Sequence, residues 1–200
     1  MEIHLKSSDL LSCISARWSP EIGDPTIMGW VTVACYFVAG VVAALVFSRQ
    51  SGRQRVFWLA LAVILFALTI NKQLDLQSAL TAAGRCMAKL QGWYAERKTF
   101  QIKFILWIIG ASVGTMIFLT WVMRRDLAQM WLALAGLLFL LTFVAIRAAG
   151  FHHFDQFIGY KIGSVRMNWI LELGGIAMIA ANGLYLLLRK GADHHGADAN

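Results

Sequence analysis

The residues best suited to chemistry in this sequence lie in one segment, residues 147–172, between two long apolar runs. It reads RAAGFHHFDQFIGYKIGSVRMNWILE and gathers histidine, carboxylate, amide and basic side chains. Histidine titrates near neutral pH and binds metals, and a carboxylate beside it can orient the ring. The segment therefore favours acid–base or metal-assisted chemistry. Its candidate residues are Arg147, His152, His153, Asp155, Asn168 and Glu172.

The two adjacent histidines allow a metal-binding interpretation. Imidazole nitrogens of His152 and His153, with a carboxylate of Asp155, would suit a divalent metal such as zinc. Adjacent residues on a helix point about 100° apart, so both rings could bind one ion only from irregular backbone. In the alternative, one histidine anchors the chain at the membrane interface and the other hydrogen-bonds Asp155 or Glu172. The sequence leaves both interpretations open, and the cofactor stays unknown.

The elements that must position these residues are membrane-spanning helices. Hydrophobic residues make up 58% of the chain and charged residues only 14%, whereas a soluble domain carries about 25% charged residues. The formal net charge is +7, but the basic residues stand at the ends of apolar runs and not on one polar face. This distribution indicates membrane topology and contact with lipid headgroups, and it argues against a nucleic-acid partner. No cleavable signal peptide is expected, because no basic region precedes an apolar core at the N-terminus.

Five apolar runs are long enough to cross a hydrocarbon layer about 30 Å thick. They predict an all-α polytopic membrane protein: an amphipathic interfacial segment over residues 1–27, a five-helix transmembrane bundle over 28–190 and a disordered tail over 191–200. The short loops RQSGRQR and RRD are rich in Arg, which indicates the cytoplasmic side. We therefore expect a bacterial inner (plasma) membrane protein with its N-terminus outside and its C-terminus in the cytoplasm. The predicted spans are 28–48, 56–76, 102–123, 127–147 and 167–188.

The second span supplies further polar candidates. Its apolar part is too short to cross alone, so Asn71, Lys72 and Asp75 would have to lie within the membrane. Asn71, Asp75 and Arg85 are spaced at i, i+4 and i+14. This spacing predicts one face of a continuous helix that extends beyond the bilayer and stops at Gly92.

The order of the spans brings the polar candidates to one side of the membrane. The second and fourth spans end there, and the third and fifth begin there. At 1.5 Å per residue, Asp75 and Glu172 both fall within about 10 Å of the outer interface, which predicts an outward-facing polar pocket. Basic residues there would either hold an anionic headgroup or neutralise the carboxylates in pairs. They are Lys72, Arg85, Arg97, Arg147 and Arg166.

The leading hypothesis is an integral membrane protein whose pocket binds an amphiphilic or anionic lipid-like substrate. As an enzyme it would be a membrane-embedded hydrolase or transferase, with His152 or His153 as base or metal ligand and Asp155 orienting that ring. Asp75 and Glu172 would serve as acid or ligand. Substrate would contact Asn71, Lys72, Arg85, Arg97, Arg147 and Asn168.

The alternative is a noncatalytic accessory or assembly subunit of a larger membrane complex, whose buried ion pairs fix the register of its helices. A proton or ion pathway ranks last, because the inner halves of several spans carry almost no polar residues.

Two further patterns bear on partners and compartment. Gly110 and Gly114 form a GxxxG face, for which packing within the chain is favoured over a homodimer seam. Cys13 and Cys86 fall in polar segments on one side of the predicted membrane. They could form a disulfide there, although their spacing matches no disulfide framework.

Overall fold

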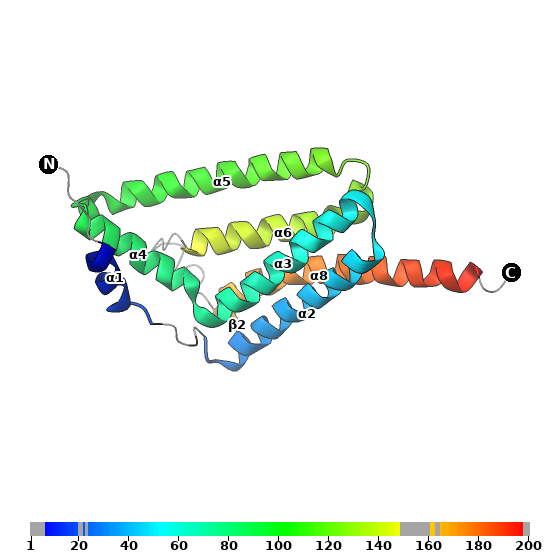
Figure 1. Cartoon of the computed structure of the whole chain (residues 1–200), viewed down its shortest axis with the longest axis horizontal. Helices are drawn as coiled ribbons and strands as arrows, with labels where there is room; N and C mark the ends of the chain where they lie inside the picture. The colour runs from blue at the N-terminus through cyan, green and yellow to red at the C-terminus, as the bar shows by residue number, and fades with distance from the viewer. Residues whose placement is uncertain (1–6, 20–21, 23, 149–160, 163–164, 198–200) are drawn as a thin grey trace.

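The protein is an all-α membrane protein, as predicted. The computed structural model describes residues 7–19, 22, 24–148, 161–162 and 165–197 (Figure 1). Within them, α2, α3, α5, α6 and α8 are long and apolar enough to cross a membrane. The elements are α1 (Ser7–Ser15), α2 (Ile27–Arg49), α3 (Gly52–Leu74), α4 (Leu76–Leu90), the 3₁₀ turn η1 (Tyr94–Glu96), α5 (Arg97–Val122), α6 (Leu127–Ala148), the two-residue strands β1 (Lys161–Ile162) and β2 (Val165–Arg166), and α8 (Met167–Ala197).

The spanning helices begin and end within a few residues of the predicted spans, except at the C-terminus. The sequence predicted a disordered tail from Gly191, but α8 continues to Ala197. Adding residues to a helix that already exists costs little, which explains how a small polar segment can extend α8. Helix α8 thus runs past the predicted end of the last span, and residues 198–200 lie outside the described part of the chain.

The spanning helices are arranged as a row in the order α3, α2, α8, α6, α5, as their neighbour contacts show. Figure 1 shows α1 and α4 at one end of the bundle, along the direction of the helix axes, and the C-terminal end of α8 at the other. We name the first the α1/α4 end; α2 and α8 begin there and α3 ends there. The opposite end carries the short turns at residues 50–51 and 123–126. The antiparallel pair β1 and β2 directly precedes α8.

Glycines let α8 approach its neighbours closely. A Cβ atom added at Gly136 of α6 would lie 2.8 Å from the carbonyl oxygen of Gly175 in α8. A Cβ atom at Gly183 would lie 2.6 Å from Val42 of α2 and 3.4 Å from the Trp58 ring of α3. In a lipid bilayer the hydrophobic effect does not drive helices together, and small residues let their backbones pack closely instead. Thus α8 is the central helix of the row.

The hydrophobic core lies between α2, α3, α6 and α8 and includes Tyr36, Trp58, Leu61, Met130 and Ile179. Helix α5 contributes little to it. Its apolar window has no buried residue among those described, whereas the windows of the other four spans are 33–39% buried. Its main contacts with another spanning helix are with α6, where Thr142 Oγ1 donates to Ser112 Oγ at 3.1 Å. At its end, Arg53 of α3 also donates to the Val122 carbonyl of α5 at 3.1 Å.

The GxxxG face of α5 is open in the described structure. A Cβ atom added at Gly110 or Gly114 would meet no heavy atom within 4 Å. The expectation that these glycines pack within the chain therefore finds no support among the described residues. The homodimer alternative remains untested.

The continuous helix predicted from the second span to Gly92 is two helices and not one. Helix α3 ends at Leu74 and α4 begins at Leu76, because Asp75 adopts the left-handed conformation with φ 47°. Asp is one of the few non-glycine residues that tolerate this region. The predicted common face of Asn71, Asp75 and Arg85 is therefore wrong, since the break changes the helix direction between them. The predicted stop at Gly92 is confirmed, with φ 79°.

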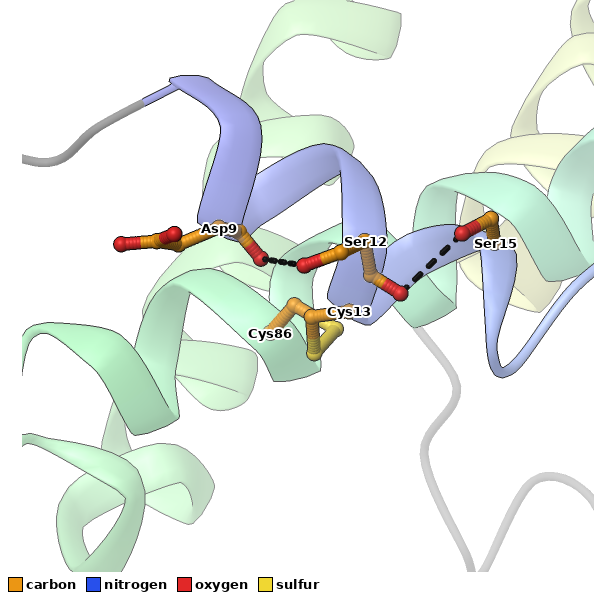
Figure 2. Close-up of a disulfide and its surroundings, with 5 residues drawn as sticks. All are labelled: Asp9, Ser12, Cys13, Ser15 and Cys86. Atoms are coloured by element: carbon orange, nitrogen blue, oxygen red, sulfur yellow. Dashed lines mark hydrogen bonds between the residues drawn. A yellow bond between two sulfur atoms is a disulfide. The ribbon is translucent and has the colours of Figure 1, made fainter.

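A disulfide fixes α1 to α4 (Figure 2). Cys13 and Cys86 are bonded, with their Cα atoms 6.0 Å apart and a separation of 73 positions in the sequence. Cys86 is fully buried beneath α1. Ser12 and Ser15 Oγ donate to backbone carbonyls within α1 and point away from the bond, as Figure 2 shows. The disulfide that the sequence allowed is therefore present, and it ties the interfacial segment to the α1/α4 end.

Candidate functional site

The candidate site is a polar network at the α1/α4 end, contributed by three spanning helices and the segment before α2. Thr26 caps α2, since its Oγ1 accepts from Gly29 N–H at 3.1 Å, and this fixes where α2 enters the bundle. Lys72 lies in the last turn of α3, and Glu172 lies in the second turn of α8. We call Asp24, Tyr36, Lys72, Trp169 and Glu172 the Glu172 network.

Glu172 has partners on both carboxylate oxygens. Lys72 Nζ lies 2.8 Å from Oε2, and the Tyr36 hydroxyl donates to Oε1 at 3.0 Å. The side chains of Lys72 and Glu172 are only 8% and 3% exposed. A buried ion pair of this kind offsets the cost of desolvating both charges only when its geometry is good and other groups satisfy the remaining lone pairs, as Tyr36 does here.

A second link joins the start of α8 to the segment before α2. The indole Nε1 of Trp169 donates to Asp24 Oδ2 at 3.3 Å, while the Thr26 hydroxyl and amide donate to Oδ1 at 2.6 and 3.3 Å. Burial raises the pKa of the Asp24 carboxyl, but hydrogen bonds from Thr26 and Trp169 and the charge of Lys72 together hold it below its ordinary value of 3.8. The network therefore holds two carboxylates that both feel the charge of one ammonium group.

The predicted site residues separate into three groups. Lys72 and Glu172 meet, which confirms that polar groups of the second and fifth spans converge. In the described part of the chain, no hydrogen bond or ion pair joins the side chains of Asn71, Asp75 and Arg85 to this network. The remaining predictions are not tested: His152, His153 and Asp155 lie outside the described residues, and the side chains of Arg97, Arg147 and Asn168 do as well.

Asp75 lies at the end of the spanning helix and not inside it. Because the chain turns at Asp75, its carboxylate is half-exposed beside the break between α3 and α4. Arg85 is exposed on α4. The side chain of α3 that reaches Glu172 is thus Lys72, about one turn before Asp75.

Sequence reasoning missed three members of the network. Tyr36 lies in a span that was judged uncharged, although a phenol in mid-span needs a hydrogen-bond partner and could have signalled one. Asp24 and Trp169 looked like an ordinary turn residue and an ordinary interfacial aromatic. No spacing pattern connects them, because their contact depends on how α2 and α8 pack.

The network can hold a fixed geometry and a fixed charge balance. Lys72 and Glu172 neutralise each other, so neither is free to act on a substrate without breaking the pair. Among the described residues, no group of three or more His, Cys, Asp or Glu side chains lies where it could hold a metal ion.

Comparisons with protein-family models, with curated proteins and with solved structures give no match.

Proposed function

We propose that this chain is a noncatalytic subunit of a membrane assembly, in which the Glu172 network locks the helices of a rigid scaffold. The single observation that carries the proposal is the Lys72–Glu172 pair, which is buried, 2.8 Å long and completed by Tyr36. Groups that satisfy one another stabilise helix register, and neither charged member of this pair is exposed. The Cys13–Cys86 disulfide, which joins α1 to α4, adds a second restraint at the same end.

The surface proposed for assembly is the Gly110/Gly114 face of α5, and the proposed occupant is a second copy of the chain. Gly110 and Gly114 have open space around them, and α5 has no buried residue among those described in its apolar window. A small-residue face lets two backbones approach closely in lipid. The Ser112–Thr142 contact holds α5 against α6, so α5 can present this face while it stays attached to the bundle.

The proposed location is a bacterial plasma membrane, with the α1/α4 end outside and the C-terminus in the cytoplasm. Two observations support this orientation independently. A Cys13–Cys86 disulfide persists in an oxidising compartment, and the turns at the opposite end are short, with Arg residues in them or directly beside them.

A second candidate function is the binding of an anionic amphiphile at the α1/α4 end, and α4 favours it. Leu76, Leu80 and Met87 share one face of α4 and are exposed. Arg85 and Lys89 are exposed on roughly the opposite face. An amphipathic basic helix of this kind lies in the membrane surface and attracts anionic headgroups. Hydrolase or transferase chemistry there, with or without zinc, would depend on His152, His153 and Asp155.

Cysteine cross-linking in native membranes tests the scaffold proposal. In a Cys35→Ser background, Gly114→Cys should form an oxidant-dependent product of twice the chain mass. Gly174→Cys is the matched control, because Gly174 lies in a spanning helix and also has open space around it. A product with Gly114→Cys alone supports a dimer through α5. A product of another mass would replace the second copy with a different partner, and no product would overturn assembly through this face.

Lipid analysis separates the second candidate from the first. Asp75→Asn and Arg85→Gln change exposed or half-exposed side chains and should leave the fold intact. If α4 binds an anionic amphiphile, Arg85→Gln should reduce the anionic lipid that remains bound in native mass spectrometry. Unchanged lipid content in both variants would reject this candidate. Metal analysis of the purified protein, expected to find about one ion per chain only if zinc binds, tests the metal-assisted form.

A further inference from the structure

A second polar cluster lies at the opposite end of the bundle. Gln54 in the first turn of α3 donates through Nε2 to Asp126 Oδ1 at 2.7 Å, which ties α3 to the turn before α6. Asn182 of α8 is 4% exposed; it accepts from Ala133 N–H at 2.9 Å and donates to the Gln129 carbonyl at 2.7 Å. Polar side chains therefore join α3, α6 and α8 near this end.

Two polar atoms next to these contacts are buried without a hydrogen-bond partner in the described structure. They are the indole Nε1 of Trp58 and the carboxamide Oε1 of Gln54. One is a donor and the other an acceptor. Because they lie four residues apart on α3, they share one face of the helix.

The orientation of the Gln54 carboxamide follows from its partner. A carboxylate can only accept, so the NH₂ group must face Asp126 and Oε1 must face away from it. Exchanging the oxygen and nitrogen would place two acceptors together at 2.7 Å. The contact with Asp126 therefore identifies Gln54 Oε1 as the acceptor that lacks a partner.

Trp58 cannot satisfy its N–H group by turning outward. The side chain is fully buried, and its benzo edge packs on Gly183, where a Cβ atom would lie 3.4 Å from Cζ3 and Cη2. The pyrrole ring with Nε1 lies on the other side of the indole. A buried N–H group without an acceptor is costly, so an acceptor must be supplied within the bundle.

We propose that a buried water molecule bridges Trp58 and Gln54. It accepts from Trp58 Nε1–H and donates one hydrogen to Gln54 Oε1. A cation would be repelled by the indole N–H dipole, and an anion by the carboxamide oxygen. Water can serve a donor and an acceptor at once, and buried waters typically make about three hydrogen bonds.

The bound water extends the set of interactions that fix α3 against α6 and α8. The fully buried Leu61 and Leu65 separate it along α3 from Lys72 in the Glu172 network. The bundle is thus closed by polar contacts at both ends, with an apolar layer between them. This inference does not depend on the proposed function.

Nitrogen-15 NMR of the Trp indole groups in lipid nanodiscs tests the proposal on the wild-type chain. The chain has eight Trp residues, and Trp58→Phe identifies the Trp58 signal by its loss. If that variant does not fold, single Trp→Phe changes at the other positions assign the signal by elimination. We expect a hydrogen-bonded indole proton with a cross-peak to water. A signal typical of a free indole, or a cross-peak to lipid in place of water, would overturn the proposal.

Discussion

Lys72 Nζ and Glu172 Oε2 lie 2.8 Å apart across the α1/α4 end of the bundle, with both side chains almost completely buried. They belong to α3 and α8, which stand on either side of α2. Tyr36 reaches the same carboxylate from α2 itself. Helix α2 packs against both α3 and α8, and all three helices meet at the Glu172 carboxylate. Loss of either charge therefore affects all three.

Single and double replacement of this pair should give opposite results. Lys72→Met or Glu172→Leu alone leaves an uncompensated buried charge and should lower the free energy of unfolding by about 3–5 kcal/mol. The double variant leaves no charge and should recover most of that loss. Thermal or denaturant unfolding in detergent micelles measures the cycle. Lys103→Met, on the exposed side of α5, is the control. A double variant as unstable as the sum of the singles would show that the two residues act separately.

The Cys13–Cys86 bond closes a loop of 73 residues and should stabilise the fold by constraining the unfolded chain. Loop-closure entropy for this length gives an upper value of about 4 kcal/mol. Cys86→Ser should therefore lower the unfolding midpoint and release α1, whereas Cys35→Ser should not. After reduction of intact cells, a membrane-impermeant maleimide should label Cys13 and Cys86. Labelling only after the membrane is opened would reverse the proposed orientation.

Glycines in α6 and α5 should respond differently to the same substitution. Gly136→Ala places a Cβ atom 2.8 Å from the Gly175 carbonyl oxygen, so α6 and α8 must move apart. Gly110→Ala has open space and should be neutral, or stabilising by up to about 1 kcal/mol through helix propensity. Unfolding of the solubilised monomer measures both. Equal destabilisation by both changes would mean that α5 packs more tightly than the described contacts indicate.

The sequence predicted the spanning helices because the length of an apolar run and the cost of burying charge both act locally. It also predicted that polar residues of the second and fifth spans meet, since the parity of the spans requires it. It did not predict that Lys72 and not Asp75 reaches Glu172, because left-handed backbone at Asp75 is allowed but not required by its residue type. Tyr36 and Asp24 were missed for a related reason: their partners follow from the helix order, which no local pattern specifies.

Acid should weaken the link between α2 and α8 through Asp24. Hydrogen bonds from Thr26 and Trp169 and the charge of Lys72 lower the Asp24 pKa below 3.8 despite the opposing effect of burial. A lowered folded-state pKa means that the stabilisation is fully present above the ordinary value and is lost as the pH falls through the lowered one. Asp24→Asn should therefore reduce stability at pH 7 and flatten its decline below about pH 4. An identical acid profile in wild type and variant would remove Asp24 as the cause.

Asn182 should hold α8 against the first turns of α6. Its carboxamide engages the Ala133 N–H and the Gln129 carbonyl, a donor and an acceptor four residues apart on α6. Asn182→Leu leaves both backbone groups without this partner and should lower the free energy of unfolding by roughly 1–2 kcal/mol. Hydrogen exchange at the Ala133 amide should rise at the same time, because the start of α6 opens more easily. Asn71→Leu makes the same change at a half-exposed residue outside the network and should alter neither readout. Faster exchange along the whole of α6 in Asn182→Leu would mean that the helix opens as one unit and that the contact acts on its global stability.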